Sequence, residues 1–197
     1  LMQQHREEQQ QGWTLLKFRG VPLRVQPSWL FALAIFTTLF QARYATEVTP
    51  TVPASISWGL GLATALLLFF SVLLHELGHA LMALREGVKV LSITLFHLGG
   101  IARVEKECST AMGSLRIAAA GPLVSLLLAL ALLGSAESAG AFSPLLTLLC
   151  TQLGLLNLML GLFNLLPVPP FDGGRILVSL VREVRQLFHS PGVQGNV

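Results

Sequence analysis

Residues 57–84 read SWGLGLATALLLFFSVLLHELGHALMAL. This stretch is long enough to cross a bilayer, because a spanning helix needs about 20 mainly apolar residues. Three ionisable side chains lie within it, namely His75, Glu76 and His79. Ionisable groups in spanning helices are energetically costly and usually functional. The stretch therefore predicts a membrane helix that carries a functional site.

The run HELGH fits the pattern His-Glu-x-x-His, in which two imidazoles four positions apart project from one helical face and can bind one Zn²⁺. Glu76 would then be placed to take a proton from water activated by the metal. The alternative is a buried cluster of these side chains satisfied by hydrogen bonds. Structural zinc sites contribute on the order of 10 kcal/mol or more. Zinc could thus offset the cost of burying the three groups, which favours a metal site.

Composition indicates a polytopic membrane protein. Of the 197 residues, 53% are hydrophobic and 12% are charged, with a mean hydropathy of +0.67. The sequence predicts an all-α bundle of about four transmembrane helices, three of them at residues 57–84, 117–136 and 145–166. Residues 29–40 are short enough to lie at the interface, but with residues 41–45 added they could form the fourth span. Residues 13–188 would form one membrane domain, between a disordered polar tail at 1–12 and a C-terminal tail at 189–197.

The basic residues predict an orientation. If residues 29–45 span, twelve of the thirteen Lys and Arg side chains lie on one side and Arg43 lies on the other. The positive-inside rule makes the richer side cytosolic, together with the N-terminus. His75 precedes Arg85 by ten residues, which places it about 15 Å from the cytosolic end of its helix. The formal net charge of +3 follows from this asymmetry and gives no reason to expect a nucleic-acid partner.

Asp172 is the leading candidate for a third zinc ligand, since catalytic zinc usually has three protein ligands. It is the first charged residue after the uncharged stretch 138–171, and three prolines at 167, 169 and 170 should unwind the chain just before it. Asp172 could instead only cap a helix that begins at Gly173. Glu105 is a competing ligand, but it lies in a self-neutralising run of charges at 103–107.

Residues 88–104 predict a short membrane-associated β-hairpin between the second and third helices, because they are rich in β-branched residues and contain Gly99-Gly100. An open edge of this hairpin could capture an extended substrate by strand addition. Alternatively, the hairpin only packs against the helices. His97 is interpreted as an interfacial residue rather than a ligand.

Two motifs together resemble the site-2 protease family of intramembrane zinc metalloproteases. HELGH lies in a hydrophobic helix, and residues 164–173 match the family motif Asn-x-x-Pro-x-Pro-x-x-Asp-Gly. Gly99-Gly100 and Gly121-Pro122 also fit, although family members often carry Asn where this chain has Ser125. The C-terminal part departs from the family pattern: residues 176–188 predict an amphipathic surface helix, where relatives commonly continue into further hydrophobic helices.

The resemblance implies roles for individual residues. It implies one zinc ion per chain held by His75, His79 and Asp172, with Glu76 as the general base. Asn164 would hold the substrate peptide or its oxyanion, and the pair Gly99-Gly100 would contact the substrate.

The resemblance also implies an activity, which is cleavage of a peptide bond within or near a transmembrane segment of a membrane-bound regulatory protein. The expected setting is a lipid bilayer, by default the bacterial inner membrane. The sequence does not decide between a monomer and a homo-oligomer. A non-catalytic membrane protein that binds transmembrane helices is the alternative function. A zinc transporter is disfavoured, because apart from Arg43 near the end of residues 29–45 no charged residue lines the halves of the predicted helices remote from His75.

Overall fold

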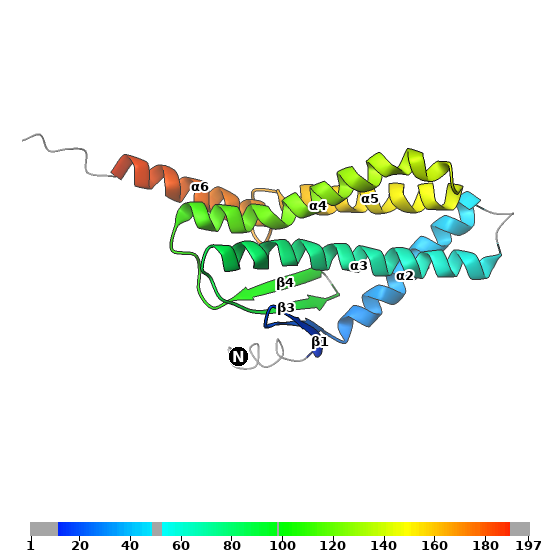
Figure 1. Ribbon diagram of the computed structural model, residues 1–197, viewed down its shortest axis with the longest axis horizontal. Helices are drawn as coiled ribbons and strands as arrows, with labels where there is room; N and C mark the ends of the chain where they lie inside the picture. The colour runs from blue at the N-terminus through cyan, green and yellow to red at the C-terminus, as the bar shows by residue number, and fades with distance from the viewer. Residues whose placement is uncertain (1–11, 49–52, 98, 190–197) are drawn as a thin grey trace, which may run out of the picture.

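The computed structural model describes residues 12–48, 53–97 and 99–189. The elements follow in the order β1 (Trp13–Phe18), β2 (Val21–Val25), α2 (Ser28–Val48), α3 (Ala54–Arg85), β3 (Val90–Phe96), β4 (Gly99–Val104), α4 (Ala111–Gly140), α5 (Pro144–Asn164) and α6 (Asp172–His189). Helix α3 runs through the middle of the molecule, with α4 and α5 along one side and the strands along the other (Figure 1). Helix α2 crosses α3 obliquely at the end remote from the strands. The predicted tails lie almost entirely outside the described residues.

Three helices of the described chain, α3, α4 and α5, are long and apolar enough to cross a membrane. They confirm membrane-length helices at three of the predicted spans, with longer bounds than the sequence indicated for α3 and α4. Residues 29–45 do form most of the 21-residue helix α2, but α2 is not among the candidate spans. Its crossing of the membrane stays a prediction.

The strands form one sheet in the order β1-β2-β3-β4. Strands β3 and β4 pair antiparallel, as expected for the hairpin at residues 88–104. The expectation of an otherwise all-α chain was wrong, because β1 and β2 extend this hairpin to four strands. Strand β2 pairs parallel with β3, so Leu23 lies opposite Ile93. A pairing between segments this far apart in the chain leaves no local trace that sequence periodicity could detect.

The second half of α3 packs on one face of the sheet. A shared apolar core joins them, formed by Val21, Leu23, Ala80, Ala83, Val88, Val90, Ile93 and Cys108. On the other side of α3, Gly78 allows a close approach of α4, since a Cβ there would lie 2.9 Å from the carbonyl oxygen of Ala120. The turn of α3 between His75 and His79 is therefore clamped between the sheet and α4.

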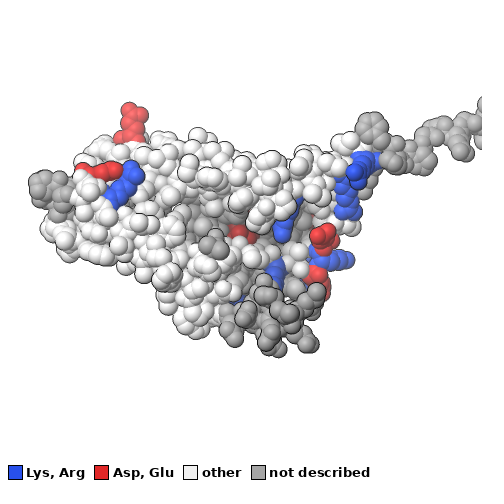
Figure 2. Space-filling view, turned by 180° about the vertical axis from the view of Figure 1, so that it is seen from behind, with Lys and Arg blue, Asp and Glu red and all other residues white. Residues whose placement is uncertain are grey.

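Charged side chains gather toward the two ends of the molecule on the face seen in Figure 2, and the surface between them carries little charge. Most of the Lys and Arg side chains visible on this face lie toward the end that carries α6, where α3 ends and α4 begins. This distribution suits a body embedded in a bilayer, where charge is tolerated at the interfaces and excluded from the hydrocarbon.

Candidate metal centre

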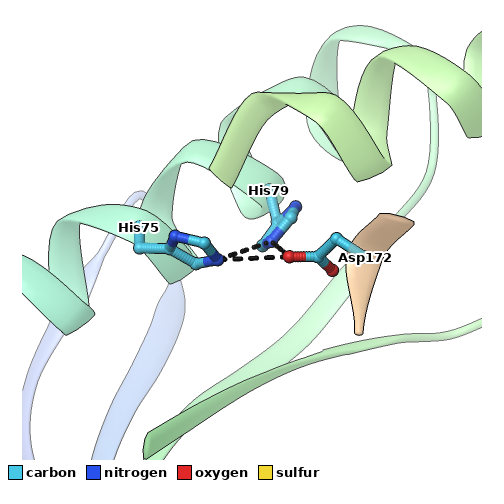
Figure 3. Close-up of side chains that lie close together, drawn as sticks. All are labelled: His75, His79 and Asp172. Atoms are coloured by element: carbon cyan, nitrogen blue, oxygen red, sulfur yellow. Dashed lines mark hydrogen bonds and ion pairs between the residues drawn. The ribbon is translucent and has the colours of Figure 1, made fainter. Parts of the chain in front are cut away.

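His75 and His79 lie one turn apart on α3 and are both buried, with 3% and 9% of their surface exposed. Asp172, the first residue of α6, points its carboxylate at both imidazoles (Figure 3). Its Oδ2 lies 3.2 Å from Nε2 of His75 and 3.1 Å from Nε2 of His79. The two Nε2 atoms are 3.2 Å apart. Within the described residues, these three side chains form the one group able to hold a metal ion.

The three ligand atoms form a nearly equilateral triangle that fits zinc. Zinc binds imidazole nitrogen and carboxylate oxygen at about 2.0 to 2.2 Å in tetrahedral geometry, which puts neighbouring ligand atoms about 3.3 to 3.6 Å apart. The observed separations of 3.1 to 3.2 Å are just below the short end of this range. Two imidazoles and one carboxylate are also a donor set of hydrolytic zinc sites, in which a fourth position stays open.

Hydrogen bonds on the far side of each ring orient the imidazoles. Nδ1 of His79 lies 2.7 Å from the carbonyl oxygen of Ile117. Because a carbonyl can only accept, Nδ1 of His79 carries a proton, so Nε2 is the ring nitrogen left to bind a metal ion at the centre. Nδ1 of His75 lies 2.9 Å from Oγ of the fully buried Ser125, which can accept a hydrogen bond from this ring in the same way. Both contacts come from α4, and such partners fix the tautomer and orientation of metal-binding histidines.

Asp172 is held in its ionised form. Burial would raise the pKa of this carboxyl, but the hydrogen bonds from His75 and His79 outweigh burial and hold its pKa well below the ordinary value. Asp172 thus lies in the first turn of α6 while its carboxylate faces the imidazoles. The same residue can therefore begin the helix and serve as a candidate metal ligand.

Gly173 allows the proline-containing segment to fold back against α6. A Cβ at Gly173 would collide with the carbonyl oxygens of Leu165 and Leu166, at the end of α5. The chain therefore turns sharply between α5 and α6, which brings Asp172 to the histidines from a separate helix.

Gly121 keeps space open on the α4 side of the site. A Cβ at this position would collide with Nε2 of His79 and would lie 2.7 Å from Nε2 of His75. The sequence signalled Gly121 only as part of a motif, without a role. It gave no signal for the Ile117 carbonyl and marked Ser125 only as a departure from the family pattern.

Glu76 points to the sheet. Its Oε2 accepts a hydrogen bond from the backbone N–H of Ala102 in β4, at 3.0 Å. A Cβ at Gly100 would lie 2.5 Å from Cγ of Glu76, so the absence of a side chain at Gly100 makes room for this contact. Glu76 directly follows a histidine of the cluster in the chain, and its role as base stays a prediction.

The remaining predicted residues lie around the site. Gly99 adopts a φ of 142° at the start of β4, which favours glycine. The side-chain amide of Asn164 donates to the carbonyl of Leu160 in its own helix, at 2.8 Å. The substrate contacts predicted for Gly99, Gly100 and Asn164 stay predictions.

The two alternative ligands occupy other positions. Glu105 is paired with Lys89 at 3.5 Å, and the ring of His97 packs edge-on against Phe96. Neither belongs to the group of potential metal ligands found among the described residues.

The model of peptidase family M50 matches residues 63–144 and 136–197 of the chain. A solved structure titled "Site-2 Protease from Methanocaldococcus jannaschii" superposes with a TM-score of 0.61 at 35% identity, covering 87% of this chain and 72% of that one. The chain belongs to the site-2 protease family, peptidase family M50. The resemblance seen in the motifs is thus confirmed for most of this family member's length.

Curated relatives of this site-2 protease family member carry zinc in their names. The chain is 44% identical over 168 residues to "Putative zinc metalloprotease sll0528" of Synechocystis sp., covering 84% of the chain and 43% of that protein. It is 36% identical over 183 residues to "Zinc metalloprotease MJ0392" of Methanocaldococcus jannaschii, covering 93% of the chain and 49% of that protein. The chain thus spans about half the length of these relatives. Zinc is the cofactor that both the family and the three converging side chains indicate.

Proposed function

We propose that the chain is an intramembrane zinc metalloendopeptidase that hydrolyses a peptide bond within or near a transmembrane segment of a membrane-bound regulatory protein. The observation that carries this proposal is the convergence of His75 and His79 from α3 with Asp172 from α6, within a triangle of 3.1 to 3.2 Å. Membership of a family whose members are named zinc metalloproteases supports it.

The chemistry follows from the residues at the site. His75, His79 and Asp172 would hold zinc, which when bound lowers the pKa of water from about 15.7 to about 7 and polarises the scissile carbonyl. The carboxylate of Glu76 accepts the proton as the water oxygen adds to the carbonyl carbon. Glu76 then donates this proton to the amide nitrogen as the C–N bond breaks.

Strand β4 is the proposed docking place for the substrate. It lies at the edge of the sheet, and edge strands offer unpaired backbone groups to an extended peptide. A transmembrane helix must unwind before its backbone can be cut, and pairing with β4 would stabilise the extended form. The contact between Ala102 and Glu76 places this edge beside the proposed base.

The membrane orientation is also part of the proposal. The Lys and Arg side chains near α6 and the C-terminus of α3 suit a cytosolic face under the positive-inside rule. The protein would then be a multi-pass membrane protein, by default of the bacterial inner membrane, with a cytosolic N-terminus. The metal centre would lie within the membrane, near the cytosolic side.

Metal content tests the proposed zinc site. We expect elemental analysis to find one zinc ion per chain in protein purified in mild detergent. A variant with His75→Ala and His79→Ala should contain almost none, because both imidazole ligands are gone. A folded parent protein without zinc would contradict the proposed protease activity. It would favour the alternative function, a protein that only binds transmembrane helices.

The variant Glu76→Gln tests the proposed base. It should keep its zinc and lose cleavage of a fluorogenic transmembrane peptide by about a hundredfold or more, which is the usual contribution of a general acid–base group. Glu105→Gln is the matched control, because Glu105 pairs with Lys89 away from the metal centre, and it should keep both zinc and cleavage. Undiminished cleavage in Glu76→Gln would disprove the role of Glu76.

A further inference from the structure

The backbone groups of β4 divide between its partner strand and its open edge. The N–H of Gln26 donates to the carbonyl of Leu95 at 2.9 Å, so the backbone of Leu95 faces β2 and not β4. Leu95 lies opposite Gly100, and Ile93 lies opposite Ala102. Because hydrogen-bonded and non-hydrogen-bonded pairs alternate along an antiparallel ladder, the backbone groups of Gly100 and Ala102 point away from β3.

The end of the same ladder agrees with this assignment. The N–H of Glu105 donates to the carbonyl of Lys89 at 2.9 Å, so the backbone of Glu105 faces β3. Because the backbone groups of successive residues in a strand point to opposite sides, those of Val104 and Ala102 face the open edge. The N–H of Ala102 is thus a donor that an added strand would use.

In the structure, the carboxylate of Glu76 accepts the hydrogen bond from the Ala102 N–H. Its Oε2 lies 3.0 Å from the Ala102 nitrogen, and its Cγ stands close above Gly100. The side chain therefore lies over Gly100 on the face of β4 and reaches the open edge at the Ala102 N–H. A peptide strand that pairs with β4 needs the same N–H for one of its own carbonyl groups.

We propose that Glu76 and the backbone of the substrate compete for the Ala102 N–H. Without substrate, this N–H holds the Glu76 carboxylate on β4. When an extended peptide docks, one of its carbonyl groups takes the N–H and releases the carboxylate to accept a proton from water. The inference rests on the proposed docking of substrate at β4 and adds that docking frees the base.

Peptide binding, rather than cleavage, tests this competition. The probe is a fluorescein-labelled decapeptide of alternating Val and Thr, titrated into the zinc-loaded full chain in detergent micelles and recovered intact after each titration. Fluorescence anisotropy should show about tenfold tighter binding to Glu76→Ala than to the parent, because the probe no longer displaces a hydrogen bond to a charged group. Glu76→Gln should bind with intermediate affinity, since the amide accepts a weaker hydrogen bond.

Two proline variants locate the effect. Ala102→Pro removes the contested N–H, and proline is tolerated where an edge strand points its N–H outward. In this background, Glu76→Ala should bring no gain in affinity. Val104→Pro is the matched control, because it removes the next outward-facing N–H, and there Glu76→Ala should still bring its full gain.

Hydrogen exchange at the Ala102 amide gives a second measurement that needs no proline. Exchange measured by NMR on ¹⁵N-alanine-labelled protein should be slow in the parent, fast in Glu76→Ala, and slow again in Glu76→Ala with saturating probe. Exchange that stays unchanged in Glu76→Ala would overturn the competition. Equal or weaker probe binding by Glu76→Ala, or an equal gain in the Ala102→Pro background, would do the same.

The inference and the proposed function fail separately. If the probe binds neither the parent nor any variant, docking at β4 and the competition are both overturned. Zinc content and cleavage of the transmembrane peptide would still decide whether the chain is a metalloprotease.

Discussion

At the scale of single residues, Ser125 is a buried hydroxyl that contacts a candidate zinc ligand and not the metal position itself. Its Oγ lies 2.9 Å from Nδ1 of His75 and it is fully buried. We expect Ser125→Ala to weaken zinc binding by about 10- to 100-fold, because hydrogen-bond partners on the far ring nitrogen of metal-binding histidines typically contribute that much. The measurement is competition with a zinc chelator in detergent.

The control for Ser125 is Ser114, a half-buried serine on the same helix whose hydroxyl donates to the carbonyl of Thr110. Ser114→Ala should leave zinc affinity unchanged. If the two variants lost affinity equally, the effect would come from α4 as a whole and the role of the Ser125 hydroxyl would be refuted.

At the scale of elements, α4 supplies both support and space to the two candidate zinc ligands on α3, His75 and His79. Gly121 faces the imidazoles so closely that a Cβ would collide with His79, whereas a Cβ at Gly134 in the same helix meets nothing within 4 Å. We therefore expect Gly121→Ala to abolish stoichiometric zinc binding and Gly134→Ala to preserve it. Alanine is favoured over glycine in helices, so helix propensity predicts no loss of helix stability in either variant.

Zinc content of the two purified variants measures this difference, and circular dichroism reports whether each stays helical. Full zinc in a helical Gly121→Ala would mean that α3 and α4 can separate enough to hold a methyl group between them. The close packing of these helices would then not define the site.

At the scale of the whole molecule, the metal centre ties together parts of the chain that are far apart in sequence, because Asp172 begins α6 and the histidines lie on α3. Zinc should therefore raise the thermal midpoint of the folded protein. A ligand that binds only the folded state adds about 2.7 kcal/mol to its stability at a hundredfold excess over Kd. Asp172→Ala should lose most of this gain, and Glu105→Ala should keep it.

Thermal unfolding in detergent, with zinc and with a chelator, measures the gain. An equal rise in midpoint for the parent and Asp172→Ala would show that α6 takes no part in the metal site. The third ligand would then have to be sought elsewhere.

Local sequence patterns determined three membrane-length helices, the shared face of His75 and His79, and the break in the chain before Asp172. These features depend on spacing along one helix, on apolar length or on proline, all of which act within a few residues. Strand β2 was missed although Val21, Leu23 and Val25 alternate with more exposed residues, because five residues are too few to signal a strand against the neighbouring basic side chains.

Tertiary structure decided the rest. The parallel pairing of β2 with β3, the support of His75 by Ser125 and the contact of Glu76 with Ala102 join segments tens of residues apart. Such contacts depend on how helices and strands pack, and no periodicity within a single segment encodes them. The sequence by itself therefore determined which residues could bind zinc, whereas only the fold decided how they are oriented and where the proposed base rests.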